Sequence, residues 1–151
     1  MDELLSSITE HANKLLGTDG CNLRLRKGNE LILSYGTKDT INLMVKKRLK
    51  IGESLAGTIA KTKKLLIVED LRDEKRYIKK HSEAAKNFGF VSFFGVPMLI
   101  EDELIGVICV YTKKPKRFIE TEIELLSSFA DQAAIAVRNA KILKKFKKQI
   151  E

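Results

Sequence analysis

The 151-residue sequence lacks an apolar run of about 18 residues, the length that a membrane-spanning helix needs, so no membrane span is predicted. Its N-terminus, MDELLSSITE, is acidic and amphipathic and does not have the pattern of a secretory signal, which favours the cytoplasm. Glycine–serine linkers, internal repeats and low-complexity segments are absent as well. We therefore expect one domain over residues 1–151.

Cysteine is scarce, and its two copies form no recognisable motif. Cys21 and Cys109 lie far apart in the sequence, outside any Cys-x-x-Cys or Cys/His cluster, so two buried thiols are expected. A redox pair or a metal site is the alternative that they leave open. The sequence also shows no nucleophile beside a base, no glycine-rich phosphate loop and no paired carboxylates, and it identifies no cofactor.

Positive charge is abundant, with a net charge of +8. Much of it lies at the C-terminal end, in Arg138, Lys141, Lys144, Lys145, Lys147 and Lys148. Lysines at a helix end suit the helix dipole and a solvated surface. Without interleaved aromatic residues or a recognition motif, nucleic acid is not a favoured partner. Contact with nucleic acid or an acidic membrane surface remains an alternative.

The clearest structural signal is a β-hairpin over residues 88–112. Two apolar runs of strand length flank the acidic residues 101–103. Because neither run alternates cleanly between apolar and polar residues, both faces should be covered, at the centre of a sheet. A tight turn predicts the cross-strand pairs Leu99 with Ile105, Pro97 with Val107, Gly95 with Cys109, and Phe93 with Tyr111.

The two faces of this hairpin differ in the size of their side chains. Gly95 and Cys109 are small and lie at the middle of one face, where a helix could approach closely. The other face is bulkier and contains Ser92, Phe94, Val96, Met98, Gly106, Ile108, Val110 and Thr112. We expect the terminal helices on the Gly95 face, with alanines of the last helix close to Gly95 and Cys109. The bulky face is then expected to look into a cavity.

Periodicity predicts the remaining elements. The expected helices cover residues 2–16, 55–62, 74–88 and 119–151, and the other strands cover 21–26, 30–35, 44–51 and 65–68. Gly17 is expected to end the first helix and Ser54 to cap the short one. Apolar residues alternate with Asn22, Arg24 and Arg26, which predicts a half-buried strand. Terminal helices with a mostly antiparallel sheet indicate an α+β fold.

Several ordered pieces of the chain carry a family resemblance. They are Ile51–Gly57 (IGESLAG), Leu66–Asp70 (LIVED), Phe90–Met98 (FVSFFGVPM), Ile105–Ile108 (IGVI), Phe118–Leu126 and Phe129–Ala140. Together they resemble the GAF family of small-molecule-sensing domains over most of the chain. The resemblance implies a profilin-like α+β fold with a six-stranded antiparallel sheet. Terminal helices then cover one face, and a ligand pocket lies on the other, beneath short helices and loops.

Candidate ligand-binding residues follow from combining the hairpin faces with this resemblance. The expected pocket floor and rim are formed by Ser92, Phe94, Ile108 and Val110, with Val68, Asp70, Arg76 and Tyr77. A guanidinium of Arg72 or Arg76 in the loop can clamp a carboxylate or phosphate. No Asn-Lys pair precedes Phe118 and Glu122, which argues against cyclic nucleotides. Neither cysteine stands where the bilin-binding members of the family carry one.

The resemblance implies a non-enzymatic sensory domain that binds an unidentified small molecule beneath loop 69–88 and signals through its terminal helices. The last helix is longer than one small core needs. Residues 141–151 are therefore expected to form a basic extension that pairs with a second copy or joins an output domain. A redox enzyme similar to the free methionine sulfoxide reductases of this fold, and a ligand-free dimerisation module, remain as alternatives.

Overall fold

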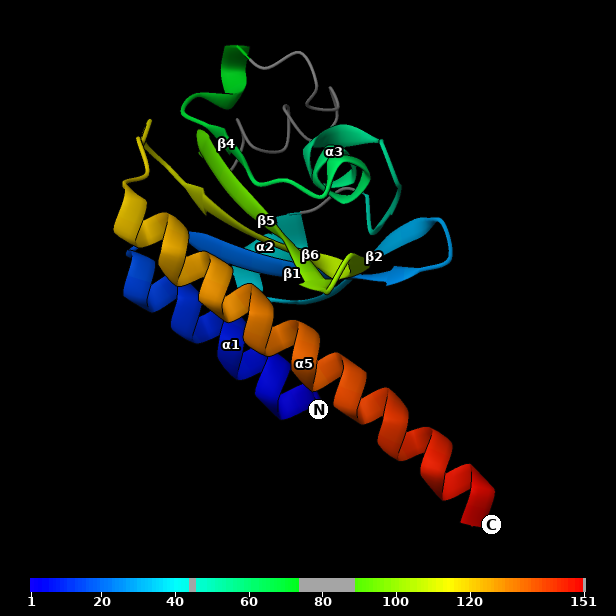
Figure 1. Ribbon diagram of the computed structural model, residues 1–151. Helices are drawn as coiled ribbons and strands as arrows, with labels where there is room; N and C mark the ends of the chain where they lie inside the picture. The colour runs from blue at the N-terminus through cyan, green and yellow to red at the C-terminus, as the bar shows by residue number, and fades with distance from the viewer. Residues whose placement is uncertain (44–45, 74–88, 151) are drawn as a thin grey trace.

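The strands of the protein form a single antiparallel sheet. The computed structural model describes residues 1–43, 46–73 and 89–150. Its strands are β1 (Gly20–Lys27), β2 (Glu30–Gly36), β3 (Arg48–Lys50), β4 (Leu66–Val68), β5 (Ser92–Ile100) and β6 (Glu103–Thr112). They pair in the order β3-β2-β1-β6-β5-β4, which puts the β5–β6 hairpin and β1 at the centre (Figure 1).

The hairpin register agrees with the sequence prediction except at its tip. Gly95 pairs with Cys109, Pro97 with Val107 and Phe93 with Tyr111, as expected. Leu99 pairs with Leu104 instead of the predicted Ile105, because the register shifts between Met98 and Leu99. The turn contains only Glu101 and Asp102, and the extra residue of the bulge then restores the predicted partners farther from the turn.

Helices cover both faces of the sheet, which confirms the α+β fold with terminal helices on one side. The helices are α1 (Asp2–Leu16), α2 (Lys38–Leu43), α3 (Ser54–Thr62) and α5 (Glu120–Ile150), with a 3-10 turn η1 (Leu71–Asp73). Helices α1 and α5 lie side by side on one face, and α3 lies on the opposite face (Figure 1). We call these the terminal-helix face and the α3 face.

The assignment of the two hairpin faces is the prediction that the structure overturns. Phe94, Ile108 and Val110 belong to the core beneath α1 and α5, and Phe93, Cys109 and Tyr111 belong to the core beneath α3. The terminal-helix core consists of Leu5, Ile8, Ala12, Leu16, Cys21, Leu23, Phe94, Val96, Met98, Ile105, Ile108, Val110, Phe118, Leu126, Ala130, Ala133, Ala134 and Val137.

Complementary side-chain size explains why the faces are exchanged. The buried stripe of α5 is rich in alanine, so the bulky Phe94 face fills the space that these small residues leave. On the other side, Ile59 of α3 lies directly over Gly95, because a Cβ at Gly95 would come within 2.5 Å of the Ile59 Cδ1 atom. Large residues therefore pack on small ones on both faces, and the alanines of α5 do not lie against Gly95.

The ends of the helices agree with the sequence prediction in some places and differ from it in others. Gly17 ends α1 in a left-handed conformation, as predicted. Ser54 is the first residue of α3 and not its cap, because Glu53 occupies the N-cap position. Helix α2 was not predicted at all, since residues 37–43 carry no apolar period. The predicted helix 74–88 lies outside the described residues, as do positions 44 and 45 of the predicted strand 44–51.

Helix α5 continues well past the core that it covers. Its buried residues end at Val137, and every residue from 141 to 150 is exposed. In Figure 1 this part of α5 extends beyond both the sheet and the start of α1. Within the described ranges, no helix combines the length and apolar character that crossing a membrane requires.

Two glycine substitutions test the packing of the central strands. We expect Gly106→Ala to lower the free energy of unfolding by about 3 kcal/mol, because its Cβ would lie 2.3 Å from the backbone oxygen of Arg24. Gly95→Ala should lower it by about 2 kcal/mol, since the tip of the Ile59 side chain can move but the buried Phe93 and Cys109 side chains, at 2.9 and 3.0 Å, also crowd the added Cβ. Urea denaturation measures both effects.

The double variant Gly95→Ala/Ile59→Val is the matched control. Removing the Ile59 Cδ1 atom eliminates the closest contact, so this pair should be more stable than the sum of its single substitutions predicts. Strict additivity would show that α3 does not press on Gly95.

Candidate functional site

The four predicted floor residues lie in the terminal-helix core or at its margin. Phe94 packs against Phe118, with ring centroids 4.9 Å apart. Ser92 is buried, and its hydroxyl forms a hydrogen bond with the hydroxyl of Thr112. Ile108 and Val110 are fully buried beneath the helices. The prediction that these residues form the floor of a cavity is therefore wrong, because α1 and α5 occupy that side.

The predicted rim residues are divided between the α3 face and the surface. Val68 is buried in the α3-side core, which also contains Leu71 of η1. Asp70 binds the guanidinium of Arg72, which donates to its two carboxylate oxygens at 2.8 and 2.5 Å. This hydrogen-bonded cation lowers the pKa of Asp70. Arg76 and Tyr77 lie outside the described residues.

Two polar residues of β1 that the sequence placed on a solvent-facing side are instead buried on the α3 face. Leu23 points into the terminal-helix core, so its neighbours Asn22 and Arg24 point to the opposite side. Asn22 is 0% exposed and Arg24 is 2% exposed. The alternation of β1 was predicted correctly, but the sheet neighbours and α2 cover the side that was expected to face water.

Arg24 fixes the segment that leads into β3. Its guanidinium nitrogens donate to the carbonyl oxygens of Lys47 at 3.1 Å and Lys46 at 2.9 Å. Charge-assisted hydrogen bonds of this kind are stronger than neutral ones, and burial reduces solvent screening further. Arg24 therefore joins the centre of the sheet to the chain on the α3 face.

Asn22 is the unusual residue of this face. Within the described residues, neither its amide nitrogen nor its carbonyl oxygen has a hydrogen-bond partner, although both atoms are buried. Asn22 pairs with Cys109 on one side and Gly36 on the other, so it lies in the middle of three adjacent strands. A buried polar group without a partner destabilises a protein by about 1–3 kcal/mol, and native structures contain few such groups.

Aromatic rings lie next to Asn22 on the same face. Tyr111 stacks with Phe90 at 5.4 Å between ring centroids and meets the edge of Phe93 at 5.4 Å. A Cβ at Gly20 would come within 3.1 Å of Phe90, so the Phe90 ring lies over the strand position two residues before Asn22. Three aromatic rings and an unpaired carboxamide are thus gathered on the α3 side of β1, β5 and β6.

Thr40 of α2 closes one side of this region, and its polar atoms are satisfied. Its hydroxyl donates to the carbonyl oxygens of Cys21 at 3.0 Å and Thr37 at 2.9 Å. A Cβ at Gly36 would lie 2.8 Å from this hydroxyl, so α2 can approach the sheet only because position 36 is a glycine. Thr40 is as deeply buried as Asn22 but has hydrogen-bond partners. The lack of partners within the described residues is therefore particular to Asn22 and not shared by the polar residues around it.

The carboxamide of Asn22 offers one donor and one acceptor side by side. Such a group binds a ligand edge that presents a neighbouring acceptor and donor, as in amides and many nitrogen heterocycles. The aromatic rings beside it suit a flat or apolar ligand body. The sequence signal for this residue was a polar side chain between Cys21 and Leu23 in a predicted strand. Because that strand was expected to be half-exposed, Asn22 was assigned to its solvent-facing side and not to a buried site.

The two thiols are both buried and do not form a pair. Cys21 belongs to the terminal-helix core and Cys109 to the α3-side core, so they lie on opposite faces of the sheet. Burial raises the pKa of Cys109 to about 12, although the nearby Arg24 acts in the opposite direction. Burial also raises the pKa of Cys21 well above its usual range. Both thiols are therefore poor nucleophiles.

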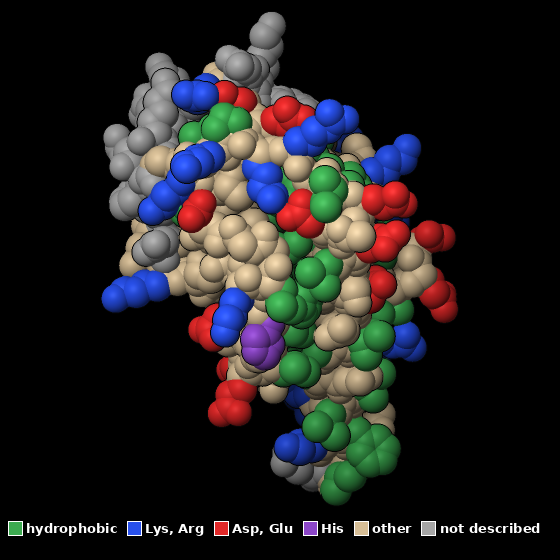
Figure 2. All heavy atoms as spheres, turned by 90° about the vertical axis from the view of Figure 1, so that its left-hand side faces the viewer, with side chains coloured by type: hydrophobic (Ala, Val, Ile, Leu, Met, Phe, Trp, Pro, Cys, Tyr) green, Lys and Arg blue, Asp and Glu red, His purple; other side chains and the backbone are tan. Residues whose placement is uncertain are grey.

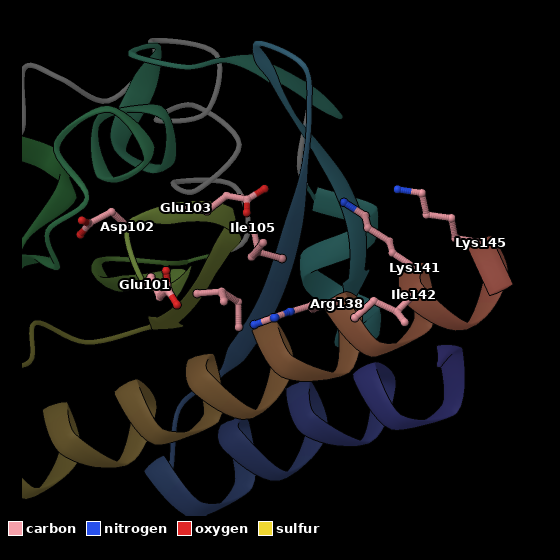
Figure 3. Close-up of a pocket in the computed structure, with 9 residues that line it drawn as sticks. Glu101, Asp102, Glu103, Ile105, Arg138, Lys141, Ile142 and Lys145 are labelled. Carbon is pink, nitrogen blue, oxygen red and sulfur yellow. The ribbon is translucent and has the colours of Figure 1, made fainter.

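A groove of about 650 Å³ separates the tip of the hairpin from α5 (Figure 3). Glu101, Asp102 and Glu103 line its hairpin side, and Arg138, Lys141 and Lys145 project from α5. Across the groove, the described residues form no ion pair. The opposite charges attract through solvent, which contributes little stability.

Metal binding has no support in the part of the chain that the structure describes. Among residues 1–43, 46–73 and 89–150, no three His, Cys, Asp or Glu side chains come together in a way that could hold an ion. Of the arrangements assembled above, the α3 face around Asn22 is the one that combines a buried carboxamide with several aromatic rings.

Comparisons with known proteins agree with this architecture. The family model for the GAF domain matches residues 1–137. A Nif-specific regulatory protein from Herbaspirillum seropedicae is 32% identical over 94 residues, which are 60% of this chain and 17% of that protein. The chain thus spans only a small part of this relative's length.

Solved structures show the same fold at low sequence identity. The GAF domain of a phosphoenolpyruvate-protein phosphotransferase from Coxiella burnetii superposes with a TM-score of 0.82 at 20% identity, covering 95% of this chain and 86% of that one. A domain of a putative sensor histidine kinase from Sinorhizobium meliloti 1021 gives 0.79 at 15% identity, covering 97% of both chains. A free methionine-R-sulfoxide reductase from Thermoplasma acidophilum gives 0.73 at 18% identity, covering 91% and 95%.

Replacing Asn22 by leucine tests whether its carboxamide is unpaired in the free protein. Asn22→Leu keeps a similar shape and removes two unsatisfied polar atoms, so we expect the free energy of unfolding to rise by about 1–3 kcal/mol. Urea denaturation of the ligand-free protein measures this change.

Thr40→Val is the control, because it removes a hydroxyl that is hydrogen-bonded and equally buried. It should lower the free energy of unfolding by about 1–2 kcal/mol. A loss of stability in Asn22→Leu as large as that in Thr40→Val would show that Asn22 has partners in solution.

Proposed function

Because the chain belongs to the GAF domain family, we propose that it is a sensory module that binds a small molecule on its α3 face and has no catalytic activity of its own. The family includes regulatory proteins such as the Nif-specific relative, and the proposal extends that role to this chain. The pocket is proposed beneath the loop that begins at residue 69, on the side of Val68 and Asn22 instead of the side of Phe94.

The unpaired carboxamide of Asn22 is the observation that carries this proposal. It lies on the most central strands, where the backbone is held on both sides by hydrogen bonds. A polar group that is held rigidly and left without partners is preorganised for a ligand, since binding supplies the hydrogen bonds that the free protein lacks. Replacing Asn22 by an apolar residue should raise the free energy of unfolding. A residue that lowers stability in this way is typical of a functional site.

A redox enzyme is the alternative, and the similarity to a methionine sulfoxide reductase structure motivates it. Thiol catalysis needs an accessible sulfur with a lowered pKa, usually beside a resolving cysteine. Cys21 and Cys109 are fully buried on opposite faces, with raised pKa values. These observations support the sensory proposal over the enzymatic one.

Signal transmission is proposed to run through the sheet to the terminal helices. Asn22 and Leu23 are adjacent in β1, and Leu23 packs in the core beneath α1 and α5. A ligand that shifts the backbone at Asn22 therefore also moves a side chain against the terminal helices. The open groove beside α5 leaves room for that helix to move relative to the hairpin tip.

The terminal helices are also proposed to pair two copies of the protein, since α5 exposes apolar residues beyond the core. We propose that the module acts in the cytoplasm and passes its signal through residues 141–151 to an output domain, as in larger regulatory proteins. A ligand-free dimerisation module would keep this pairing and lose the response to small molecules.

Thermal unfolding with small probes tests ligand binding. We would screen nicotinamide, uracil and glutamine, which present neighbouring N–H and C=O groups, against benzoate, which has no donor. Any probe that binds the folded protein at a hundredfold excess over its dissociation constant should raise Tm by about 5–10 °C. Mass spectrometry of small molecules released from the freshly purified protein extends the panel.

Asn22→Leu is the matched control, because it should keep the fold and lose the response. We expect its Tm to stay unchanged with any probe that stabilises the wild type. An equal response of both proteins would place the site elsewhere, and a response to benzoate alone would contradict a role for the carboxamide.

A further inference from the structure

Helix α5 changes its charge where it leaves the domain core. Residues 120–137 contain four acidic side chains and no Lys or Arg, whereas residues 138–150 contain six basic side chains and no acidic one. The change follows directly after Val137, the last buried residue of the helix. We call residues 138–150 the basic tail, and most of it extends beyond the sheet in Figure 1. The projecting part of α5 is therefore purely cationic.

The basic tail also carries apolar residues on one side. Leu143, Phe146 and Ile150 follow one another in steps of three and four residues, so they share one side of the helix. They are 59%, 59% and 73% exposed, and Ile142 at the margin of this side is 54% exposed and also lines the groove. We call these four residues the tail stripe. Figure 2 shows hydrophobic side chains gathered at the projecting end of α5, with basic side chains beside them.

The tail stripe faces away from the domain body. Val137 is buried against the core and lies nine residues before Phe146, which is about two and a half turns of the helix. Phe146 is therefore on the opposite side of α5 from Val137. The acidic residues Glu101 and Glu103 belong to the hairpin side of the groove, so they do not lie in front of the stripe (Figure 3).

Lysines border the tail stripe and cover the rest of the tail. Lys145 and Lys147 precede and follow Phe146, which places them a little more than a quarter turn to either side of it. The long apolar stem of a lysine can lie along an apolar surface while its ammonium group reaches a polar one. An exposed apolar stripe with basic flanks and a cationic opposite side is the pattern of helices that lie in a membrane interface.

We infer that the basic tail binds an anionic membrane surface, with the tail stripe inserted at the boundary of headgroups and acyl chains and Lys145 and Lys147 beside the lipid phosphates. The helix would lie in the plane of the surface and not cross it. The cytoplasmic leaflet of cell membranes carries anionic lipids, so this surface exists in the compartment proposed above. The inference goes beyond the sensory function, because it concerns where the module is held.

Charge complementarity favours a lipid surface over the other occupants of the tail stripe. Two tail stripes that faced each other would bring Lys145 and Lys147 of both copies together, and like charges beside such a contact oppose it. An anionic surface neutralises the same lysines. Exposed apolar residues before the basic tail, such as Ile119 and Ile135, stay available for the proposed pairing of two copies. Nucleic acid would attract the lysines but leave the tail stripe in water.

Flotation with lipid vesicles tests the inference. Wild-type protein should bind phosphatidylcholine vesicles that contain about one third phosphatidylserine at least about tenfold more tightly than pure phosphatidylcholine vesicles, since each lysine near an anionic surface contributes about fivefold. Added salt should weaken the binding, because it screens exposed charges. Equal binding to both kinds of vesicle, or no binding to the anionic vesicles at low salt, would overturn the inference.

Phe146→Ser tests insertion of the tail stripe. We expect it to lower the partition coefficient into the anionic vesicles about tenfold or more, because the phenylalanine ring no longer leaves water. Ile119→Ser is the matched control: it removes an apolar side chain that is 60% exposed and lies outside the basic tail, so binding should not change. If Phe146→Ser binds as tightly as the wild type, the stripe is not inserted and the inference is wrong.

Lys145→Gln/Lys147→Gln tests the role of the flanking charges. This double variant should bind the anionic vesicles about tenfold or more weakly than the wild type and should bind neutral vesicles equally well. Lys113→Gln/Lys114→Gln removes the same charge from exposed positions outside the tail and should leave both results unchanged. Equal losses in the two double variants would show that net charge acts without a defined surface, which contradicts the inference.

Measurements without lipid separate the remaining occupants. A wild-type dimer that Phe146→Ser dissociates, in a protein that binds no vesicles, would assign the tail stripe to a second copy. Binding to a DNA duplex without binding to vesicles would assign the lysines to nucleic acid. Either result would overturn the inference, and neither changes the response to small probes that is expected at Asn22.

Discussion

The pairing of β1 with β6 is the constraint on which the rest of the molecule depends. It places Asn22 opposite Cys109 and Leu23 opposite Ile108, and so decides which side chains enter each core. Because side chains alternate along a strand, a shift of one residue would move Asn22 beneath the terminal helices and Leu23 to the α3 face. The apolar contacts of both layers hold this register, and the bulge near Met98 absorbs the mismatch at the hairpin tip.

Size complementarity between layers then determines what each face can do. The alanine-rich stripe of α5 and the apolar stripe of α1 pack on the bulky side of the hairpin, and together they form one buried core. The α3 face is covered by the short helix α3, and it holds the polar residues Asn22 and Arg24 of β1. One sheet thus separates a packed, apolar layer from a layer that contains buried polar side chains.

Helix α5 also has two surfaces, one buried against the sheet and one exposed. Its inner stripe ends at Val137 and belongs to the domain core, whereas the apolar residues Ile135, Ile142, Leu143, Phe146 and Ile150 are exposed. In the proposed function, a ligand that alters the sheet acts on the inner stripe, and because α5 is one continuous helix, a small displacement there is carried to its exposed end.

Periodicity in the sequence determined the strands, the terminal helices, the hairpin register away from its tip and the α+β class, because each depends on local spacing of apolar residues. Two features could be established only from the tertiary structure. Alternation alone separates the Phe94 side from the Gly95 side, but only the packing of α5 alanines and of Ile59 decides which helices cover each. Likewise, Asn22 became a buried, unpaired group only when β2, β6 and α2 closed around β1, since burial depends on neighbours that are remote in sequence.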